Sequence, residues 1–394
     1  MICRVCDGTK LEKVLDLGNQ PWCNHFLKPE EVGTEPTYPL RVVFCHDCST
    51  TQLDYTVKKE IMFGDHTYLS GVTKSLSSHF KSVADEIDAI VPHKNRKKTV
   101  LDIGSNDGTQ LKHFQALGYE VLGVESSKTT AKIAMADNVP TLNAFFNLET
   151  AKTIGKKFDV INAAGVFFHL EELHSVTEGI RESLEPDGTF MVQFLYMKKI
   201  VENLAFDQIY HEHYYYWMIT PLAKLFAQYG LSIISVSEHA IHGGTMRIIS
   251  TNRGRGHCEA VQKYIDEESL FDFKDWGMRV HSKIKGDEEI IRDLLKMGKV
   301  ACFGAGAKSC VYLNCINQDL VKDIEYVVDD TLVKQGKFMP GTSLCVVDRT
   351  RLYEDQPDYL ILLIHNFKDH IITSLRPQYK GTIIVMVPTL EKYS

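Results

Sequence analysis

Two cysteine pairs near the N-terminus constrain the fold of this chain more than any other feature. Cys3 and Cys6 form one C-x-x-C pair, and Cys45 and Cys48 form the other. Two such pairs can supply the four thiolate ligands of a tetrahedral zinc site. A module this small has a weak hydrophobic core, and a structural metal adds the missing stability. The sequence therefore predicts a zinc-binding module over residues 1–70. The alternative is two unrelated turns with free thiols.

Charge and cysteine usage narrow the class of protein. The 394-residue chain has a formal net charge of -7 and a pI of about 6.2, which disfavours a protein that binds nucleic acid through bulk charge. A basic run, Lys94 to Lys98, is interpreted as a solvated linker. The N-terminus lacks the apolar stretch of a signal peptide, and free cysteines suit a reducing compartment. We expect a cytoplasmic monomer that binds neither nucleic acid nor a membrane.

Beyond residue 70 the pattern is typical of an α/β protein. Apolar strands expected at 100–103, 120–125 and 158–162 alternate with helical segments, which predicts a parallel, doubly wound sheet over residues 71–255. A smaller α/β unit is expected over residues 256–394, with its first strand at 299–303.

The turn after the first of these strands predicts a cofactor site. It contains Asp102, Gly104, Ser105, Asn106, Asp107 and Gly108. Glycines let a backbone approach a ligand closely, and an acid at the end of the next strand, here Glu125, commonly binds ribose hydroxyls. NAD is one possible ligand, but the turn is not G-x-G-x-x-G. S-adenosylmethionine fits better, because an acid-rich turn suits its ammonium group. The sequence therefore predicts a Rossmann-like class I methyltransferase domain.

A second glycine-rich turn lies in the C-terminal unit. Gly304 to Lys308 follows a strand and is expected to open a helix, an arrangement that suits an anion. We favour a nucleotide-sugar diphosphate as the ligand. An NAD site with Asp329 as its acid remains the alternative.

Five motifs follow one another along the chain: the two cysteine pairs, Asp102 to Gly108, Tyr210 to Tyr214, His242 to Thr245, and Gly304 to Lys308. In this order they resemble the motifs of the nucleotide-sugar C-methyltransferases that make branched deoxysugars. The resemblance implies a zinc module that helps form the sugar site, a middle domain that binds S-adenosylmethionine and a C-terminal domain that helps hold the nucleotide. It also implies methyl transfer to C-3 of a 4-keto-6-deoxy sugar carried on a nucleotide.

Two positions depart from the expected motifs. Ser309 stands where a third glycine is expected, and His365 stands where an aromatic residue is expected before Asn366. The first departure is expected to alter contacts at the diphosphate, whereas Asn366 remains available for hydrogen bonding.

Methylation of carbon requires a carbanion equivalent, so the site needs a base, a donor for the enolate oxygen and precise alignment. We assign the base to His213, because a neutral imidazole is available near pH 7. Glu212 could orient the sugar or hold a proton, and Tyr210 could hydrogen-bond the enolate oxygen or the sugar hydroxyls. The alternative is that this segment is only a packed aromatic stripe, and His211 is expected to be structural. His242, Gly243, Lys308 and Asn366 are the predicted substrate-binding residues.

Two functions of other classes remain open at this point. One is a zinc-ribbon RNA methyltransferase, which the acidic balance disfavours. The other is a sugar-nucleotide binding protein without activity. Neither the nucleotide nor the final sugar is specified by the sequence.

Overall fold

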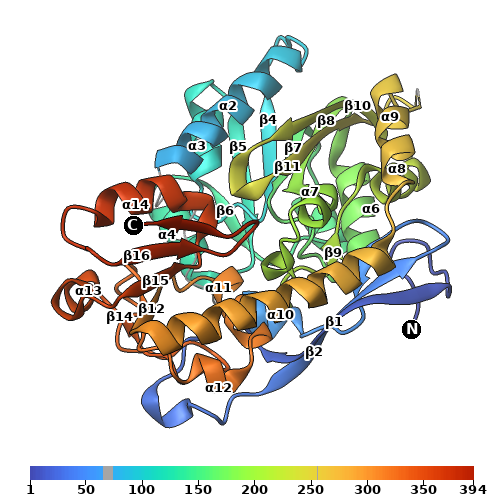
Figure 1. The fold of residues 1–394 in the computed structure, drawn as a ribbon. Coiled ribbons are helices and arrows are strands. Elements are labelled where there is room, and N and C mark those ends of the chain that lie inside the picture. The colour runs from blue at the N-terminus through green and yellow to red at the C-terminus, as the bar shows by residue number, and fades with distance from the viewer. Residues whose placement is uncertain (65–73, 255) are drawn as a thin grey trace.

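Three β-sheets organise the molecule, one for each predicted segment. The computed structural model describes residues 1–64, 74–254 and 256–394 (Figure 1). The predicted domain boundaries at 70/71 and 255/256 fall on or beside residues outside these ranges. Among the described residues, no helix is long and apolar enough to cross a membrane.

The N-terminal sheet is antiparallel and contains a strand from a distant part of the chain. Its order is β1-β2-β3-β9, with bounds β1 Leu11–Pro21, β2 Thr37–Cys45, β3 Thr51–Leu53 and β9 Tyr215–Tyr216. Thr51 pairs with Tyr216, and Gln52 pairs with Tyr215. The segment that carries Tyr210 to His213 is therefore tied directly to the N-terminal module.

The central sheet has seven strands in the order β10-β11-β8-β7-β4-β5-β6. The strands are β4 Thr99–Ile103, β5 Glu120–Glu125, β6 Thr141–Asn143, β7 Phe158–Ala164, β8 Leu184–Leu195, β10 Ser232–His239 and β11 Thr245–Thr251. β4 to β8 are parallel, whereas β11 is antiparallel to β8 and β10 is antiparallel to β11. This confirms the predicted doubly wound α/β domain and adds an antiparallel edge that the sequence did not indicate.

Helices cover both faces of the central sheet because successive strand residues point to opposite sides. Val100 packs with α2 and α3, whereas Leu101 belongs to the core shared with α6 and α8. The helices of this domain, and of the segment that leads into it, are α1 Lys59–Phe63, α2 Lys74–Ile90, α3 Thr109–Ala116, α4 Lys128–Ala136, α5 Leu148–Ile154, α6 Leu173–Ser183, α7 Met197–Glu202 and α8 Ile219–Gln228. A short 3-10 turn, η3 (Phe206–Gln208), follows α7.

The C-terminal sheet has the order β14-β13-β12-β15-β16-β17, which is parallel except for β17. Its strands are β12 Val300–Phe303, β13 Val327–Val328, β14 Val346–Val347, β15 Tyr359–Leu362, β16 Thr382–Val385 and β17 Glu391–Tyr393. The helices are α9 Glu259–Glu268, α10 Phe273–Met297, α11 Ala307–Cys315, α12 Gln318–Val321, α13 Arg349–Asp355 and α14 Lys368–Leu375, with a 3-10 turn η5 at His365–Phe367. The predicted smaller α/β unit is therefore present.

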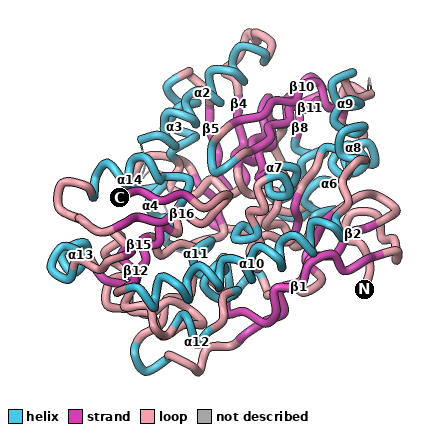
Figure 2. Tube along the Cα trace, in the orientation of Figure 1, coloured by secondary structure: helices cyan, strands magenta, loops and turns pink. Residues whose placement is uncertain are grey.

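The long helix α10 connects the outer sheets. It runs along one side of the molecule from β1 to the C-terminal sheet (Figures 1 and 2). Helix and strand approach so closely at Gly277 that a Cβ atom there would lie 1.8 Å from the carbonyl oxygen of Val14. Only glycine fits this contact, so α10 fixes the N-terminal sheet against the rest of the chain.

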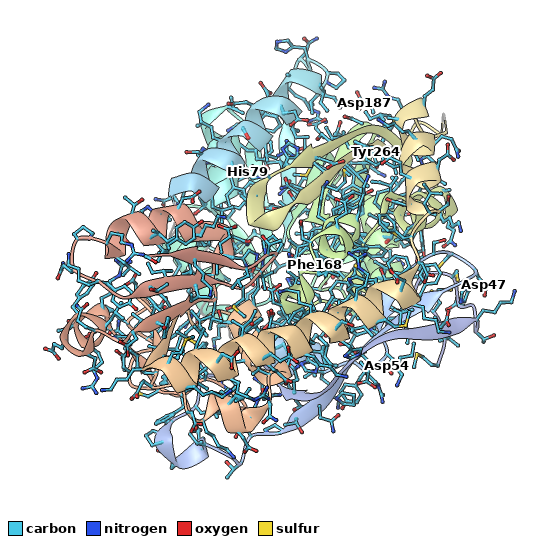
Figure 3. The ribbon with its side chains drawn as sticks, in the orientation of Figure 1. Asp47, Asp54, His79, Phe168, Asp187 and Tyr264 are labelled. Atoms are coloured by element: carbon cyan, nitrogen blue, oxygen red, sulfur yellow. The ribbon has the colours of Figure 1, made fainter. Side chains whose placement is uncertain are left out.

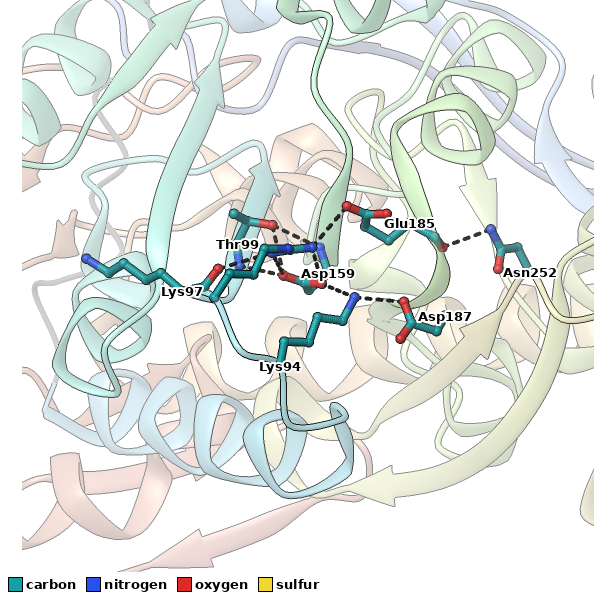
Figure 4. Close-up of polar contacts among 8 residues, drawn as sticks. Lys94, Lys97, Thr99, Asp159, Glu185, Asp187 and Asn252 are labelled. Atoms are coloured by element: carbon teal, nitrogen blue, oxygen red, sulfur yellow. Dashed lines mark hydrogen bonds and ion pairs between the residues drawn. The ribbon is translucent and has the colours of Figure 1, made fainter.

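The interpretation of the basic run as a solvated linker is wrong. Lys94 and Arg96 converge on Asp159, whose side chain is only 1% exposed (Figure 4). Arg96 forms two hydrogen bonds to Asp159, of 2.7 and 3.0 Å, and the backbone N–H of Thr99 donates a third of 2.9 Å. The run is therefore a structural anchor for the start of β4.

Candidate active site and zinc site

The four cysteines of the N-terminal module form one cluster. Their sulfur atoms all lie within 4.8 Å of one another, with 3.5 Å between Cys3 and Cys48 and 3.7 Å between Cys6 and Cys45. Zn–S bonds of about 2.3 Å in a tetrahedron place sulfur atoms about 3.8 Å apart. The hydrogen bond from Cys48 lowers the pKa of Cys3 to about 5, and the same pairing raises the pKa of Cys48. The donor set and its spacing fit a structural zinc ion.

The predicted cofactor turn lies at the carboxyl ends of β4 and β5. Gly104, Asn106 and Gly108 all have positive φ angles, of 69°, 51° and 75°. A Cβ atom at Gly104 would lie 2.7 Å from Val166, so glycine is required there by contact as well as by backbone conformation. Ser105 is buried, and its hydroxyl has no hydrogen-bond partner among the described residues.

Glu125 braces this turn from the end of β5. Its two carboxylate oxygens accept hydrogen bonds from the backbone N–H groups of Asn106, at 2.8 Å, and Ser127, at 2.7 Å. The side chain of Asp107 closes the turn by accepting hydrogen bonds from the N–H and the hydroxyl of Thr109. The predicted cofactor residues are therefore adjacent and held by one hydrogen-bond network.

Asp102 lies beneath the turn, inside the sheet. It is 4% exposed, and Asn162 on β7 donates a hydrogen bond of 2.5 Å to it. Burial raises the pKa of Asp102 to about 7, although the Asn162 hydrogen bond acts in the opposite direction. Asp102 thus supports the edge of the sheet at which a cofactor would bind.

His213 occupies a buried aromatic cage next to η3. Its ring lies 3.8 Å from that of Tyr210 and 4.5 Å from that of Phe168, which is near the middle of the molecule in Figure 3. The Nδ1 atom lies 3.2 Å from the carbonyl oxygen of Gln208. Burial lowers the pKa of His213 well below its ordinary value, and the charges of His169 and Lys308 add to this effect. A neutral ring that donates from Nδ1 keeps a lone pair on Nε2, as a base requires.

Glu212 is held by the N-terminal module. Its Oε1 accepts hydrogen bonds from the indole N–H of Trp22, at 2.6 Å, and from the side-chain amide of Asn24, at 2.7 Å. The carbonyl oxygen of Glu212 lies 2.5 Å from Nδ1 of His169. The ring of His169 is 5.1 Å from that of His213, so Glu212 and both histidines belong to one site.

His211 points away from this site. Its Nε2 lies 3.2 Å from the carbonyl oxygen of Tyr38, and its ring makes an edge contact with the Tyr38 ring. The expected structural role therefore agrees with its position.

Two of the predicted substrate-binding residues meet above η3. A Cβ atom at Gly243 would lie 3.3 Å from the amide oxygen of Asn366 and 3.5 Å from the amide nitrogen of Gln208. Gly243 has a φ of 91°, so glycine is favoured there. The backbone of His242 belongs to the same 3-10 turn, Ile241–Gly243, but its side chain lies outside the described part of the structure.

Lys308 and His365 approach the site from the C-terminal domain. Nδ1 of His365 lies 3.7 Å from the buried carboxylate of Asp207 on η3. Burial lowers the pKa of Lys308, and the charge of Asp207 opposes that shift. Burial lowers the pKa of His365, so the histidine that departs from the expected aromatic residue is a polar neighbour of Asp207 at the domain junction.

The C-terminal glycine-rich turn is also braced by an acid. Asp329 accepts a 2.7 Å hydrogen bond from the N–H of Ala305, and Lys334 donates a 2.6 Å hydrogen bond to the carbonyl oxygen of Ala305. The Ser309 hydroxyl accepts a 3.3 Å hydrogen bond from the N–H of Gly306. The serine that replaces the expected glycine thus fixes the loop.

Three family models cover most of the chain. Residues 3–63 match a model described as "Putative zinc binding domain", residues 76–236 match "Methyltransferase domain", and residues 240–388 match "C-methyltransferase C-terminal domain". Together, the three matches indicate a C-methyltransferase. As a C-methyltransferase, the protein combines a zinc-binding module with a methyltransferase domain that uses S-adenosylmethionine.

Relatives of this C-methyltransferase include one that matches nearly the whole chain. C-methyltransferase NovU of Streptomyces niveus is 28% identical, over 98% of this chain and 95% of the relative. An uncharacterized methyltransferase of Alkaliphilus oremlandii is 23% identical, over 45% of this chain and 85% of the relative.

Similar solved structures cover about half of this C-methyltransferase. The PH0226 protein from Pyrococcus horikoshii OT3 is 18% identical and covers 50% of this chain and 99% of that one, with a TM-score of 0.37. A second similar structure is the Haloferax volcanii complex between the Trm112 methyltransferase activator and a methyltransferase. The match is 17% identical and covers 45% of this chain and 92% of that one, with a TM-score of 0.37.

Sequence reasoning missed the residues that other elements bring to the site. Trp22 and Asn24 lie 190 and 188 residues from Glu212 along the chain. Asp207 carries no motif, and no spacing rule marks it. The one available signal was that Trp22 and Asn24 lie in a module that the family resemblance already placed beside the sugar.

Proposed function

We propose that this C-methyltransferase transfers a methyl group from S-adenosylmethionine to C-3 of a nucleotide-linked 4-keto-6-deoxy sugar. The observation that carries the proposal is the environment of His213. A buried imidazole, held through Nδ1 and kept neutral by burial, is suited to remove a proton from carbon next to a ketone.

In this reaction Nε2 of His213 takes the proton from C-3, and the electron pair of the C–H bond moves to give an enolate with its charge on the C-4 oxygen. The Tyr210 hydroxyl is assigned as a donor to that oxygen. S-adenosylmethionine, held by the Gly104 to Gly108 turn, would supply the methyl group: its sulfonium C–S bond would break as C-3 forms the new C–C bond, giving S-adenosylhomocysteine. The burial of His213 among the rings of Phe168 and Tyr210 supports its role as a neutral base.

The cofactor assignments follow the braced turn. We assign Gly104, Ser105, Asn106, Asp107 and Gly108 to the methionine and adenosine groups, and Glu125 to the ribose hydroxyls. Asp102 is assigned to the ammonium end of the ligand. Support comes from the hydrogen bonds that fix Glu125 and from the positive φ angles of the turn.

The nucleotide is assigned to the junction of the middle and C-terminal domains. Lys308 would pair with the diphosphate, while His242, Gly243 and Asn366 would bind the sugar or the phosphates. This assignment is supported by the proximity of Gly243, Asn366 and Gln208.

The test is proton exchange at carbon. In D₂O, with dTDP-4-keto-6-deoxyglucose, the wild-type protein should exchange the C-3 hydrogen, and the H213N variant should lose this exchange by at least 100-fold. His174, which contacts the hydroxyl of Tyr229 instead, provides the control variant H174N, which should retain exchange. With S-adenosylmethionine present, NMR should locate the new methyl group on C-3.

Several outcomes would contradict the proposal. Both C-3 and C-5 lie next to the C-4 ketone, so a methyl group on C-5 would overturn the assigned position. Undiminished exchange in H213N would remove His213 as the base. Methylation of RNA, or no turnover with any keto-sugar nucleotide, would favour one of the other functions.

A further inference from the structure

We propose that Trp22 and Asn24 are positioning residues that hold Glu212 as an ionised hydrogen-bond acceptor, so that the zinc module controls the catalytic site. This inference rests on the proposed function, and it goes beyond it by assigning a role to Glu212 and to two residues outside the methyltransferase domain.

The geometry begins with two short hydrogen bonds to one oxygen atom. Trp22 Nε1 and Asn24 Nδ2 both donate to Oε1 of Glu212, at 2.6 and 2.7 Å. An indole N–H and an amide N–H can only donate, so Glu212 must accept in both contacts. Hydrogen bonds to a charged acceptor are shorter and stronger than those to a neutral one.

This arrangement decides between the two roles that Glu212 could have. A carboxyl group that stores or delivers a proton must spend part of the reaction cycle neutral. Two donors aimed at one oxygen stabilise the charged form and disfavour the neutral form. Glu212 is therefore an acceptor that orients a hydroxyl of the sugar, and proton transfer is left to His213.

The two donors are rigidly connected to the zinc module. Trp22 directly follows β1, whose last residue, Pro21, pairs with Thr37 on β2. The backbone of the same loop is closed by a 3.2 Å hydrogen bond from the N–H of His25 to the carbonyl oxygen of Trp22. β2 itself ends at Cys45, one of the four clustered cysteines. The paired strands β1 and β2 therefore connect the cysteine cluster to the loop that carries Trp22 and Asn24.

The far side of the loop is anchored to the C-terminal domain. Leu27 exchanges backbone hydrogen bonds of 2.9 and 2.8 Å with Phe338. The loop is consequently fixed at both ends, and its two side chains reach Glu212 from a defined direction. This explains how an otherwise peripheral module could set the geometry of the reaction.

The direct test measures the protonation of Glu212 without substrate. Protein labelled with ¹³C at the glutamate side-chain carboxyl is titrated by NMR, and the E212Q variant assigns the Glu212 signal. W22F removes one donor but keeps the aromatic ring, and N24A removes the other. Each should raise the titration midpoint of Glu212 by about one pH unit, as expected for loss of one hydrogen bond to a charged group.

The chain offers a matched control. The indole N–H of Trp276 is buried but has no hydrogen-bond partner among the described residues, so W276F should leave the titration of Glu212 unchanged. Asn24 is exposed, so N24A also carries the test if W22F does not fold. Thermal unfolding and binding of S-adenosylmethionine report on the fold of every variant.

A kinetic measurement separates positioning from simple packing. In W22F and N24A the acid limb of the pH profile of kcat/KM should move upward together with the Glu212 midpoint. An unchanged Glu212 midpoint in both variants would overturn the inference, whatever the activity. A shifted midpoint in a protein that methylates no keto sugar would instead contradict the proposed function alone.

Discussion

At the scale of single residues, Asp159 shows how one buried carboxylate organises a loop. It accepts hydrogen bonds from Arg96 and from the backbone of Thr99, and it forms a 2.6 Å ion pair with Lys94. Burial alone would raise the pKa of Asp159, but the hydrogen bonds from Arg96 and Lys94 outweigh it and hold the pKa below its ordinary value. The carboxylate therefore stabilises the folded protein.

The first prediction concerns the pH dependence of this contribution. A carboxyl group whose pKa is lower in the folded state stabilises the protein above its unfolded pKa, about 3.9, and this contribution is lost as pH falls through the folded pKa. D159N should lower the free energy of unfolding by about 2 kcal/mol at pH 7 and by less near pH 3, which lies below the unfolded pKa. Urea denaturation at both pH values measures this.

The control for this prediction is an exposed carboxylate of the same domain. Asp137 pairs with Lys112, but its side chain is 53% exposed, so D137N should cost less than about 0.5 kcal/mol. An equal loss for D159N at both pH values would show that the charge of Asp159 is not the cause.

At the scale of elements, α2 depends on a polar network as well as on apolar packing. Arg247 on β11 is buried and pairs with Glu86, while its Nε donates a 3.1 Å hydrogen bond to Gln193 on β8. Nε2 of His79, labelled in Figure 3, lies 3.1 Å from the same Gln193 oxygen. Burial lowers the pKa of His79 and of His239, whose rings lie 5.8 Å apart.

The second prediction follows from those lowered pKa values. A histidine that is harder to protonate when folded supports the fold above its unfolded pKa, about 6.5, and this support is lost as pH falls below it. Between pH 7.5 and 5.5, amide exchange in residues 76–90 should accelerate by about tenfold after correction for intrinsic rates. H79Q should show a clearly smaller acceleration, with His239 accounting for the rest, whereas a wild-type response in H79Q would exclude His79 as an origin.

At the scale of the whole molecule, the zinc cluster and the cofactor turn belong to different sheets. The cysteines lie in and beside the N-terminal sheet, whereas the turn lies on β4 and β5 of the central sheet. The two sites should therefore respond separately to loss of the metal.

The third prediction tests this separation. Chelation of zinc, or the C6S variant, should reduce methyl transfer at least 20-fold while the Kd for S-adenosylmethionine changes less than threefold, because the donors to Glu212 lose their support. Calorimetry measures the Kd, and product mass measures transfer. Restored activity after zinc is returned is the control, and a parallel loss of cofactor binding would contradict the prediction.

Most of the fold could be predicted because its signals are local. Alternating apolar and helical segments located β4, β5 and β7, and the cysteine spacing located the metal cluster. β9 could not be predicted, since two residues carry no periodicity and their partner strand, β3, is 162 residues away. The basic run was misinterpreted because the acid that neutralises it, Asp159, lies on another strand.

The residues of the candidate site could likewise be predicted only where their signal is local in the sequence. The glycine turn and the Tyr210 to His213 segment stand out as motifs, so the sequence was sufficient to select them. The partners of those residues, such as Trp22 for Glu212 and Asp207 for His365, come from distant parts of the chain and become visible only when the chain is folded.

The β3–β9 pairing also sets a rule for building chimaeras. Because β9 completes the N-terminal sheet, residues 1–63 cannot be exchanged on their own without losing one strand of that sheet. A graft of that region from a relative would need the donor's own 210–217 equivalent to travel with it. Recombination in this family should therefore leave the two segments co-inherited, although more than 140 residues of sequence separate them.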